Sequence, residues 1–418
     1  MAQLSDDCFA GAGELMPLDR ALDLIRARLK PAVEAEEVPL VAAHGRILAS
    51  DLTAAMAVPP HDNAAVDGYA FRFTDLTEGL ETRLKIVGRA AAGHPFTPAL
   101  PAGAAVRIFT GAPIPDGADT VVMQEDVDVA DDTVVVPQGL APGANHRKVG
   151  EDVAQGELLL DAGHRLTPQD LGLAASVGFA YLAVFRRLRV AVFSTGDELR
   201  EPGSDLPDGA IYDANRFMLL GLLTELGAEP HDMGILRDDR DTVRRALAGA
   251  ADDHDLVISS GGVSVGEEDH VGAALRDMGR LHFWRLAIKP GRPIALGQIG
   301  PVPFVGLPGN PAAAILTFLR LVRPIIDSLS GAKITPPRFY PVIAGFTHSK
   351  KKGRREWVRV RIEMDGGGRL VAHKFPRQGA GVLSSVARSD GIVELPEDAT
   401  RVEPGAALDF LSFAELGA

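Results

Sequence analysis

The chain of 418 residues contains one cysteine, Cys8, which excludes disulfides within the chain and zinc sites built from several thiolates. No hydrophobic run approaches the ~18 residues that cross a membrane. The N-terminus, with Asp6, Asp7 and Glu14, lacks the basic start and apolar stretch of a secretory signal. We therefore expect a cytoplasmic protein with no membrane partner.

Basic residues are outnumbered by acidic ones, and the formal net charge is −13. Nonspecific binding of nucleic acid needs a broad cationic surface that neutralises phosphates, so we expect no nucleic-acid partner. The densest basic run lies within residues 350–361. The more frequent interpretation of such a run is an exposed strand whose charges block edge-to-edge pairing. The alternative is that one or two of these cations face a polyanionic ligand.

Several catalytic signatures are missing as well. The 11 histidines include no H-E-x-x-H motif, and no G-x-S-x-G motif stands at a strand-to-helix turn. A Rossmann dinucleotide fingerprint is absent too. These absences argue against a zinc protease, a serine hydrolase and a dinucleotide-binding enzyme.

The hydrophobic pattern changes along the chain. Strands alternate with helices over residues 187–331, which predicts a doubly wound α/β domain with a parallel sheet and helices on both faces. Short β-type runs broken by Pro and Gly predict a small β-rich domain at 55–149, and alternating runs predict a β-barrel or sandwich at 332–418. Apolar residues at helical spacing predict an amphipathic helix from Leu18 to Leu29.

Two predicted strands of the α/β domain end in similar polar loops. Residues 190–193 run into Ser194-Thr195-Gly196-Asp197-Glu198, and residues 256–258 run into a Gly-Ser loop at 259–266. Glycine lets backbone N–H groups approach an anion, and the hydroxyls add donors. Because parallel strands bind ligands beyond their carboxyl ends, both loops are expected to line one crevice.

Three carboxylates follow predicted strands of the same domain: Glu198, Asp238 and Asp269. Their convergence would raise the pKa of at least one carboxyl unless a cation intervened. Mg²⁺ would relieve that repulsion and bridge to substrate oxygens. The alternative is that Asp238 and Asp269 only cap helices, which a lone Asp after a strand does more often.

Two further loops favour anions. Lys289 lies in a Pro- and Gly-stiffened segment, which suits a small oxyanion, although a lone lysine is more often a solvated surface residue. Residues 307–311 follow another strand and expose backbone N–H groups at a helix start, with Asn310 placed to cap and Pro311 at the first helical position.

Together these motifs resemble the molybdopterin molybdenumtransferases, the MoeA proteins related to the C-terminal part of gephyrin. The resemblance covers nearly the whole chain. It is carried by residues 194–199, 211–216, 259–269, 286–291 and 306–311 and, earlier in the chain, by residues 62–70, 107–113, 121–125 and 150–152.

The resemblance implies an elongated homodimer of four-domain subunits. Residues 1–54 and 150–186 would form a helical and extended linker domain that contributes to dimerisation, and 187–331 would bind molybdopterin. The active cleft would lie between this α/β domain and the β-rich domain of the other subunit. The implied reaction converts adenylylated molybdopterin and molybdate into molybdenum cofactor with release of AMP, assisted by Mg²⁺. Other proteins of cofactor biosynthesis are candidate partners.

The resemblance also implies functional residues by motif. The implied catalytic residues are Asp67, Asp152, Glu198, Asp238, Asp269 and Lys289, of which Glu198, Asp238 and Asp269 would bind the metal. The implied substrate-binding residues are Thr110, Ser194, Thr195, Gly196, Asp213, Asn215, Ser260, Gly261, Gly262, Ser264, Arg285, Pro308, Gly309, Pro311 and Arg359. The chain departs from the family pattern at Arg285, where lysine is frequent, at Ala64 and Val66, where Ser and Met are commoner, and at Ala380, where a serine is expected.

Two other functions compete with this one. Adenylylation of molybdopterin by ATP uses a related α/β domain, but it needs only that domain, whereas this chain has additional ones. A scaffold that binds the pterin without turnover is the second alternative, and the intact acidic motifs argue against it.

Overall fold

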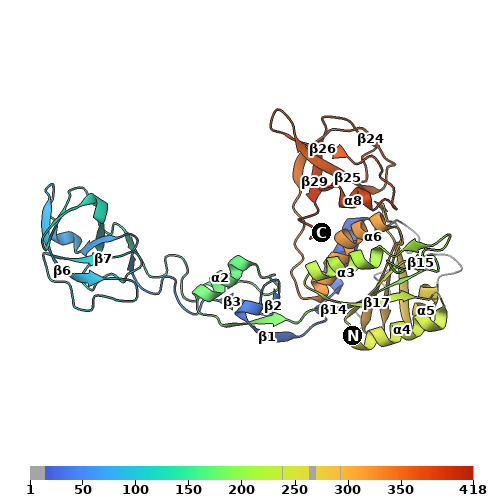
Figure 1. Cartoon of the computed structure of the whole chain (residues 1–418), viewed down its shortest axis with the longest axis horizontal. Coiled ribbons are helices and arrows are strands. Elements are labelled where there is room, and N and C mark those ends of the chain that lie inside the picture. Colours follow the sequence, from blue (N-terminus) through green and yellow to red (C-terminus); the bar gives the residue numbers. More distant parts are fainter. Residues whose placement is uncertain (1–14, 238, 263–269, 292, 418) are drawn as a thin grey trace.

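The computed structural model describes residues 15–237, 239–262, 270–291 and 293–417. The molecule is elongated (Figure 1), with a β-rich part at one end, a thin linker part in the middle, and an α/β part and a C-terminal barrel together at the other end. The chain passes through the linker part twice, once before and once after it builds the β-rich end.

The linker part combines two segments that lie far apart in the sequence. Its sheet has the order β1-β13-β2, and strands β3 and β12 form a separate pair. Helix α2 begins with a capping box in which Thr167 and Asp170 satisfy each other's backbone N–H groups. The bounds are β1 Ala35–Pro39, the 3₁₀ turn η2 Leu40–Ala42, β2 Ile47–Leu48, β3 Leu52–Thr53, β12 Leu158–Leu160, α2 Pro168–Ser176 and β13 Tyr181–Phe185.

The β-rich part is a six-stranded sheet with the order β8-β5-β7-β6-β10-β9. Successive residues of a strand point to opposite faces. Accordingly, Ala70 packs into one core, and its neighbours Tyr69 and Phe71 pack into another on the other face. The bounds are β4 Asn63–Ala64, β5 Gly68–Phe71, η3 Phe73–Asp75, β6 Thr82–Ala90, β7 Ala104–Ile108, β8 Thr120–Met123, η4 Gln124–Asp126, β9 Asp128–Ala130, β10 Thr133–Val136 and β11 His146–Arg147, which pairs with β4.

The α/β part has a six-stranded sheet with the order β17-β14-β18-β22-β21-β19. Strands β14 Arg189–Thr195, β17 Glu229–Leu236, β18 Leu256–Ser260 and β22 Val302–Leu307 are parallel, as expected. The expectation of a wholly parallel sheet is wrong, because β21 Pro293–Ile299 and β19 Gly279–Arg285 extend it as antiparallel strands. The short strands β15 Leu199–Arg200 and β16 Ile211–Tyr212 pair beside it.

Helices cover both faces of this sheet, as the sequence predicts (Figure 1). On β14, Val190 and Val192 pack toward one helical layer, and Ala191 and Phe193 pack toward the other. The first layer holds α1 Leu18–Arg28, α3 Asn215–Glu225, α6 Pro311–Thr317, the π-helical turn η5 Phe318–Val322 and α7 Arg323–Leu329. The second holds α4 Arg240–Asp253 and α5 His270–Met278.

The C-terminal part is a closed five-stranded barrel, since strand β25 pairs with both β26 and β27 and closes the order β25-β26-β23-β29-β27. Strand β20 of the preceding part adds to β25 in parallel and joins the barrel to the α/β part. The bounds are β20 Ile288–Lys289, β23 Tyr340–Ala344, β24 His348–Ser349, β25 Arg355–Met364, β26 Leu370–Lys374, α8 Ser384–Ala387, β27 Gly391–Leu395, β28 Arg401–Val402 and β29 Ala407–Ser412. None of the helices in the described segments is long and apolar enough to cross a bilayer.

Candidate functional site

A small pocket of about 110 Å³ lies at the carboxyl edge of the parallel strands. Loops that follow β14, β18 and β22 line it together with the start of α3. Its walls are Thr195, Glu198, Leu199, Ile211, Tyr212, Asp213, Ala214, Asn215, Ser260, Gly261, Gly309 and Pro311. The structure thus brings together residues from four of the motifs that the sequence singles out.

Asn215, at the start of α3, joins two of these loops. Its side-chain amide nitrogen donates to Ser260 Oγ at 2.9 Å and to the Gly309 carbonyl at 2.8 Å. The side chain is almost fully buried. The loop after β18 and the loop after β22 are therefore held at a fixed separation by one amide.

Two glycines, Gly196 and Gly262, pack closely against residues that line the pocket. Gly262 has φ +65°, and a Cβ there would lie 2.3 Å from Thr195 Cγ2. Gly196 has φ +150°, and a Cβ there would lie 2.5 Å from Glu198 Oε2. The Glu198 carboxylate consequently lies directly over Gly196, at the rim of the pocket.

Glu198 is the one predicted metal ligand that can be placed, because Asp238 and Asp269, like Ser264, lie outside the described residues. Its carboxylate is exposed and could supply one oxygen ligand to a cation. Within the described residues, no group of three His, Cys, Asp or Glu side chains could hold a metal ion. Helix α4 is capped by Asp239, whose carboxylate accepts from the Thr242 N–H at 2.9 Å.

Two other predicted residues near the pocket are buried. They are Asp213, which is paired with Arg216, and Ser194. Asp213 is buried and accepts from Arg216 Nε at 3.0 Å, and Arg216 also contacts Glu201 and Asp232. Ser194 is fully buried, and its Oγ has no hydrogen-bond partner among the residues that the structure describes. Asp213 therefore shapes the pocket wall with its carboxylate already paired, and Ser194 lies behind the pocket.

The start of α6 differs from expectation. Asn310 occupies the N-cap position, but its side chain makes no capping hydrogen bond to the described backbone. The carbonyl of Ala380, in a barrel loop, instead accepts from the Ala312 N–H at 2.9 Å. The prediction that Asn310 caps this helix through its side chain is wrong. A backbone carbonyl from the barrel, that of Ala380, accepts the hydrogen bond from the Ala312 N–H at the helix start instead.

Lys289 is held by a barrel residue that the sequence does not single out. Its Nζ donates to Glu356 Oε1 at 2.8 Å, and His348 Nε2 lies 2.9 Å from the same oxygen. Burial alone would raise the pKa of Glu356, but the hydrogen bonds from His348 and Lys289 outweigh it and hold that pKa below its ordinary value. Lys289 is therefore an exposed lysine, as the alternative interpretation has it, but one whose ammonium is paired with a buried carboxylate.

Arg359 lies on the same strand as Glu356 and is fully buried. It donates to Ser385 Oγ at 3.0 Å and to the Gly379 carbonyl at 3.1 Å, and both of these partners are neutral. Burial lowers the pKa of Arg359 to about 10. Of the other predicted residues in this region, Arg285 is exposed at the end of β19 and Pro308 is half-buried just after β22.

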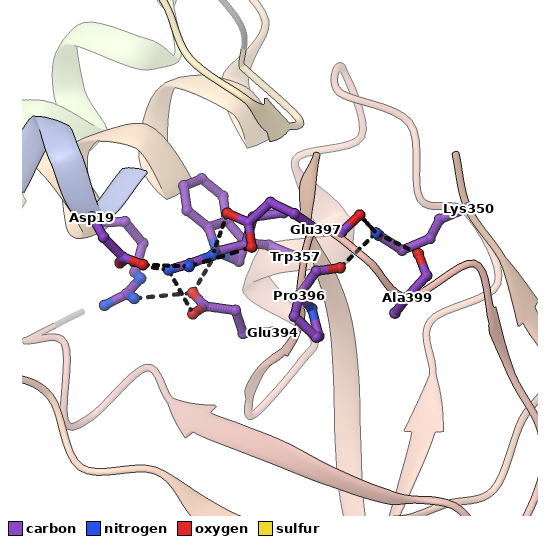
Figure 2. A network of polar contacts seen from close by, with 9 residues as sticks. Asp19, Lys350, Trp357, Glu394, Pro396, Glu397 and Ala399 are labelled. Atoms are coloured by element: carbon purple, nitrogen blue, oxygen red, sulfur yellow. Dashed lines mark hydrogen bonds and ion pairs between the residues drawn. The ribbon is translucent and has the colours of Figure 1, made fainter. Parts of the chain in front are cut away.

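The basic run at 350–361 is not an exposed edge strand. Strand β25 pairs on both sides, Lys350 donates to the carbonyls of Pro396 and Ala399, and Arg355 bonds to Asp19 and to Glu397 (Figure 2). The interpretation of these cations as charges that block edge pairing is wrong, because carboxylates and carbonyls from other segments satisfy several of them.

At the β-rich end, Asp67 and Thr110 meet. Thr110 donates to Asp67 Oδ1 from its backbone nitrogen at 2.8 Å and from its hydroxyl at 2.7 Å, and these bonds lower the pKa of Asp67. Asp152 is exposed in the loop between β11 and β12. This end lies opposite the α/β part (Figure 1), so Asp67 and Asp152 do not reach the Glu198 pocket of their own chain.

Sequence reasoning missed Glu356 and His348. Glu356 stands within the basic run, where it looks like one surface carboxylate among cations, and His348 meets it only because β24 folds beside β25. A larger cavity, of about 340 Å³, lies between α1, α7 and the C-terminal segment and includes Arg26, Arg323 and Glu415 in its lining. It contains none of the predicted site residues.

Three family models match the chain in succession. They are the MoeA N-terminal region (domain I and II) at residues 16–178, a probable molybdopterin binding domain at 191–328, and the MoeA C-terminal region (domain IV) at 341–413. They follow one another in the order of the linker and β-rich parts, the α/β part and the barrel.

Curated relatives and solved structures match over nearly the full length. A molybdopterin molybdenumtransferase of Haemophilus influenzae is 40% identical over 405 residues, which cover 96% of this chain and 100% of the relative. A molybdopterin molybdenumtransferase 2 of Mycobacterium tuberculosis is 36% identical over 89% of this chain and 93% of its own length. The molybdopterin biosynthesis MoeA protein of Pyrococcus horikoshii OT3 superposes with a TM-score of 0.82 at 30% identity, covering 96% of this chain and 100% of that one. The chain belongs to the molybdopterin molybdenumtransferase family of enzymes.

Proposed function

We propose that this enzyme inserts molybdenum from molybdate into adenylylated molybdopterin and releases AMP, with Mg²⁺ as cofactor. The observation that carries the proposal is the pocket in which Asn215 joins the Ser260 and Gly309 loops at the carboxyl edge of the sheet. Ligand pockets for whole small molecules usually measure roughly 300–1,000 Å³. A pocket of about 110 Å³ therefore suits one phosphate-sized group of the substrate.

The residues around the pocket have distinct proposed roles. Thr195, Ser260 and Gly261 offer hydroxyl and backbone N–H donors to phosphate oxygens. Glu198 would hold Mg²⁺ together with Asp238 and Asp269, and the bound ion would neutralise phosphate charge. Lys289, Arg285 and Arg359 would meet molybdate, a compact dianion that needs cationic neighbours.

A second copy of the chain completes the proposed cleft. Asp67, Thr110 and Asp152 lie at the far end of the elongated subunit (Figure 1), so they act in catalysis only if the β-rich part of one subunit faces the α/β part of another. The proposal therefore includes a homodimer.

The test is AMP release from adenylylated molybdopterin by the purified protein, with and without molybdate. We expect molybdate-dependent release in the wild type and none in Glu198→Gln. Glu225→Gln, a change at the exposed far end of α3, serves as the matched control and should keep full activity.

Three results would overturn the proposal. These are full activity of Glu198→Gln, adenylylation of molybdopterin by the protein with ATP, and AMP release that never depends on molybdate. The second would support an adenylyltransferase and the third a scaffold. A parallel reaction with tungstate measures which tetrahedral oxyanion the site prefers.

A further inference from the structure

The Glu356 carboxylate lies near four basic side chains where the barrel joins the α/β part. They are Lys289, His348, Lys350 and Arg359. Glu356 Oε1 accepts from Lys289 Nζ at 2.8 Å and lies 2.9 Å from His348 Nε2. Arg359 and Lys350 are the other positive groups close enough for Glu356 to affect their pKa values. These four groups come from β20, β24, β25 and the segment between the latter two strands.

The ion pair between Lys289 and Glu356 joins an exposed side chain to a buried one. The Glu356 side chain is 6% exposed, whereas the Lys289 side chain is 48% exposed. The parallel pairing of β20 with β25 places Lys289 and Glu356 directly beside each other. The ammonium group of a surface lysine is thus held by a buried oxygen, which restricts the rotamers of the side chain before any ligand binds. An isolated lysine would lose this conformational entropy when it binds an anion, so the ion pair lowers the entropy cost of binding.

Lys289 is the exposed cation of this group, since Lys350 and Arg359 are buried. Lys350 lies near Glu397 and Asp398 as well as Glu356. An ammonium group has three N–H donors, and the bond to Glu356 uses one of them. Lys289 can therefore donate to an incoming anion while Glu356 holds it.

We propose that Glu356 is a positioning residue that fixes Lys289 Nζ to receive the oxyanion substrate. The proposal rests on the role of Lys289 proposed above. Lys289 touches the oxyanion, and Glu356 acts only through Lys289.

A double-mutant cycle tests whether Glu356 acts through Lys289. The quantity is kcat/KM for molybdate in the wild type, Glu356→Gln, Lys289→Ala and the double variant. We expect Glu356→Gln to lower kcat/KM roughly ten-fold, mostly through KM, and to have no further effect once Lys289 is absent. Fully additive losses would refute the proposal, since a residue that only stabilises the barrel would act independently of Lys289.

Glu394→Gln is the matched control. Glu394 is also a largely buried barrel carboxylate, but it contacts Arg320 and Trp357 rather than Lys289. It should lower stability without changing KM for molybdate.

A second measurement does not depend on catalysis. Lysines labelled by reductive ¹³C-methylation give one NMR signal each, and the Lys289 signal is identified by its loss in Lys289→Arg. The chemical shift of this signal should change in Glu356→Gln, because the Lys289 ammonium then loses its ion-pair partner. An unchanged Lys289 signal in Glu356→Gln would overturn the positioning role even if the protein proved inactive toward molybdate. Failure of the AMP assay alone would count only against the proposed function.

Discussion

The substitution Gly262→Ala tests how tightly the loop after β18 packs against the loop after β14. Gly262 has φ +65°, and an added Cβ would lie 2.3 Å from Thr195 Cγ2 and 2.8 Å from Val271 Cγ2. A left-handed conformation costs an L-residue about 1–2 kcal/mol. Overpacking a filled site costs a further ~1–3 kcal/mol. We expect the free energy of unfolding of the α/β part to fall by roughly 2–5 kcal/mol.

Gly249→Ala provides the matched control, because Gly249 lies in the interior of α4 and no heavy atom stands within 4 Å of its added Cβ. A helical glycine replaced by alanine should stabilise the protein by roughly 0.5–1 kcal/mol. Amide hydrogen exchange in β14 and β18, followed in urea, reports on the α/β part separately from the other parts.

The same substitution should also lower AMP release, because Thr195 must move away from the added methyl group and Thr195 lines the pocket. If the free energy of unfolding of Gly262→Ala is within about 0.5 kcal/mol of the wild-type value and AMP release is unchanged, the loop after β18 must rearrange without cost. The close packing of Gly262 on Thr195 would then be irrelevant to the site.

Two further substitutions separate electrostatics from packing. Thr110→Val removes the hydroxyl bond to Asp67 but keeps the backbone bond, so the lowered pKa of Asp67 should move part of the way up toward its ordinary value, as ¹³C NMR of the carboxyl can show. Because the folded pKa of Asp67 is depressed, the Thr110 interaction stabilises the fold above the ordinary pKa and is lost as the pH falls through the folded one. An unchanged Asp67 titration would contradict this. Arg359→Met removes two hydrogen bonds from a charged donor, roughly 3–6 kcal/mol together, but also the cost of burying that charge. Thermal stability should therefore change little while KM for molybdate rises, and a large loss of stability at constant KM would assign Arg359 a structural role.

Much of the fold can be predicted because burial imposes periodicity. The alternation on β14 and its neighbours places the parallel strands correctly, since each face must pack against helices. Helix α1 spans Leu18–Arg28, within one residue of the amphipathic helix that its apolar spacing predicts. The antiparallel strands β19 and β21 could not be predicted in this way, because a period of two residues is the same for both strand directions.

The partners of charged residues are the part that sequence patterns do not reveal. Arg355 bonds to Asp19, more than 300 residues earlier in the chain, and Lys350 bonds to carbonyls of the segment before β28 (Figure 2). In the sequence, the run at 350–361 is a local excess of positive charge. In the fold, that charge is distributed between a buried network and one strand that faces the α/β part.

The same reasoning explains why motifs identify Lys289 but not Glu356. A motif records residues that are adjacent in sequence, whereas the contact between Lys289 and Glu356 follows from the pairing of β20 with β25 across the boundary between two parts of the molecule. An acidic chain with a net charge of −13 can attract an oxyanion only where the fold concentrates cations. Lys289, Lys350 and Arg359 lie at this junction, and Glu356 is the carboxylate that holds the exposed one, Lys289, in place.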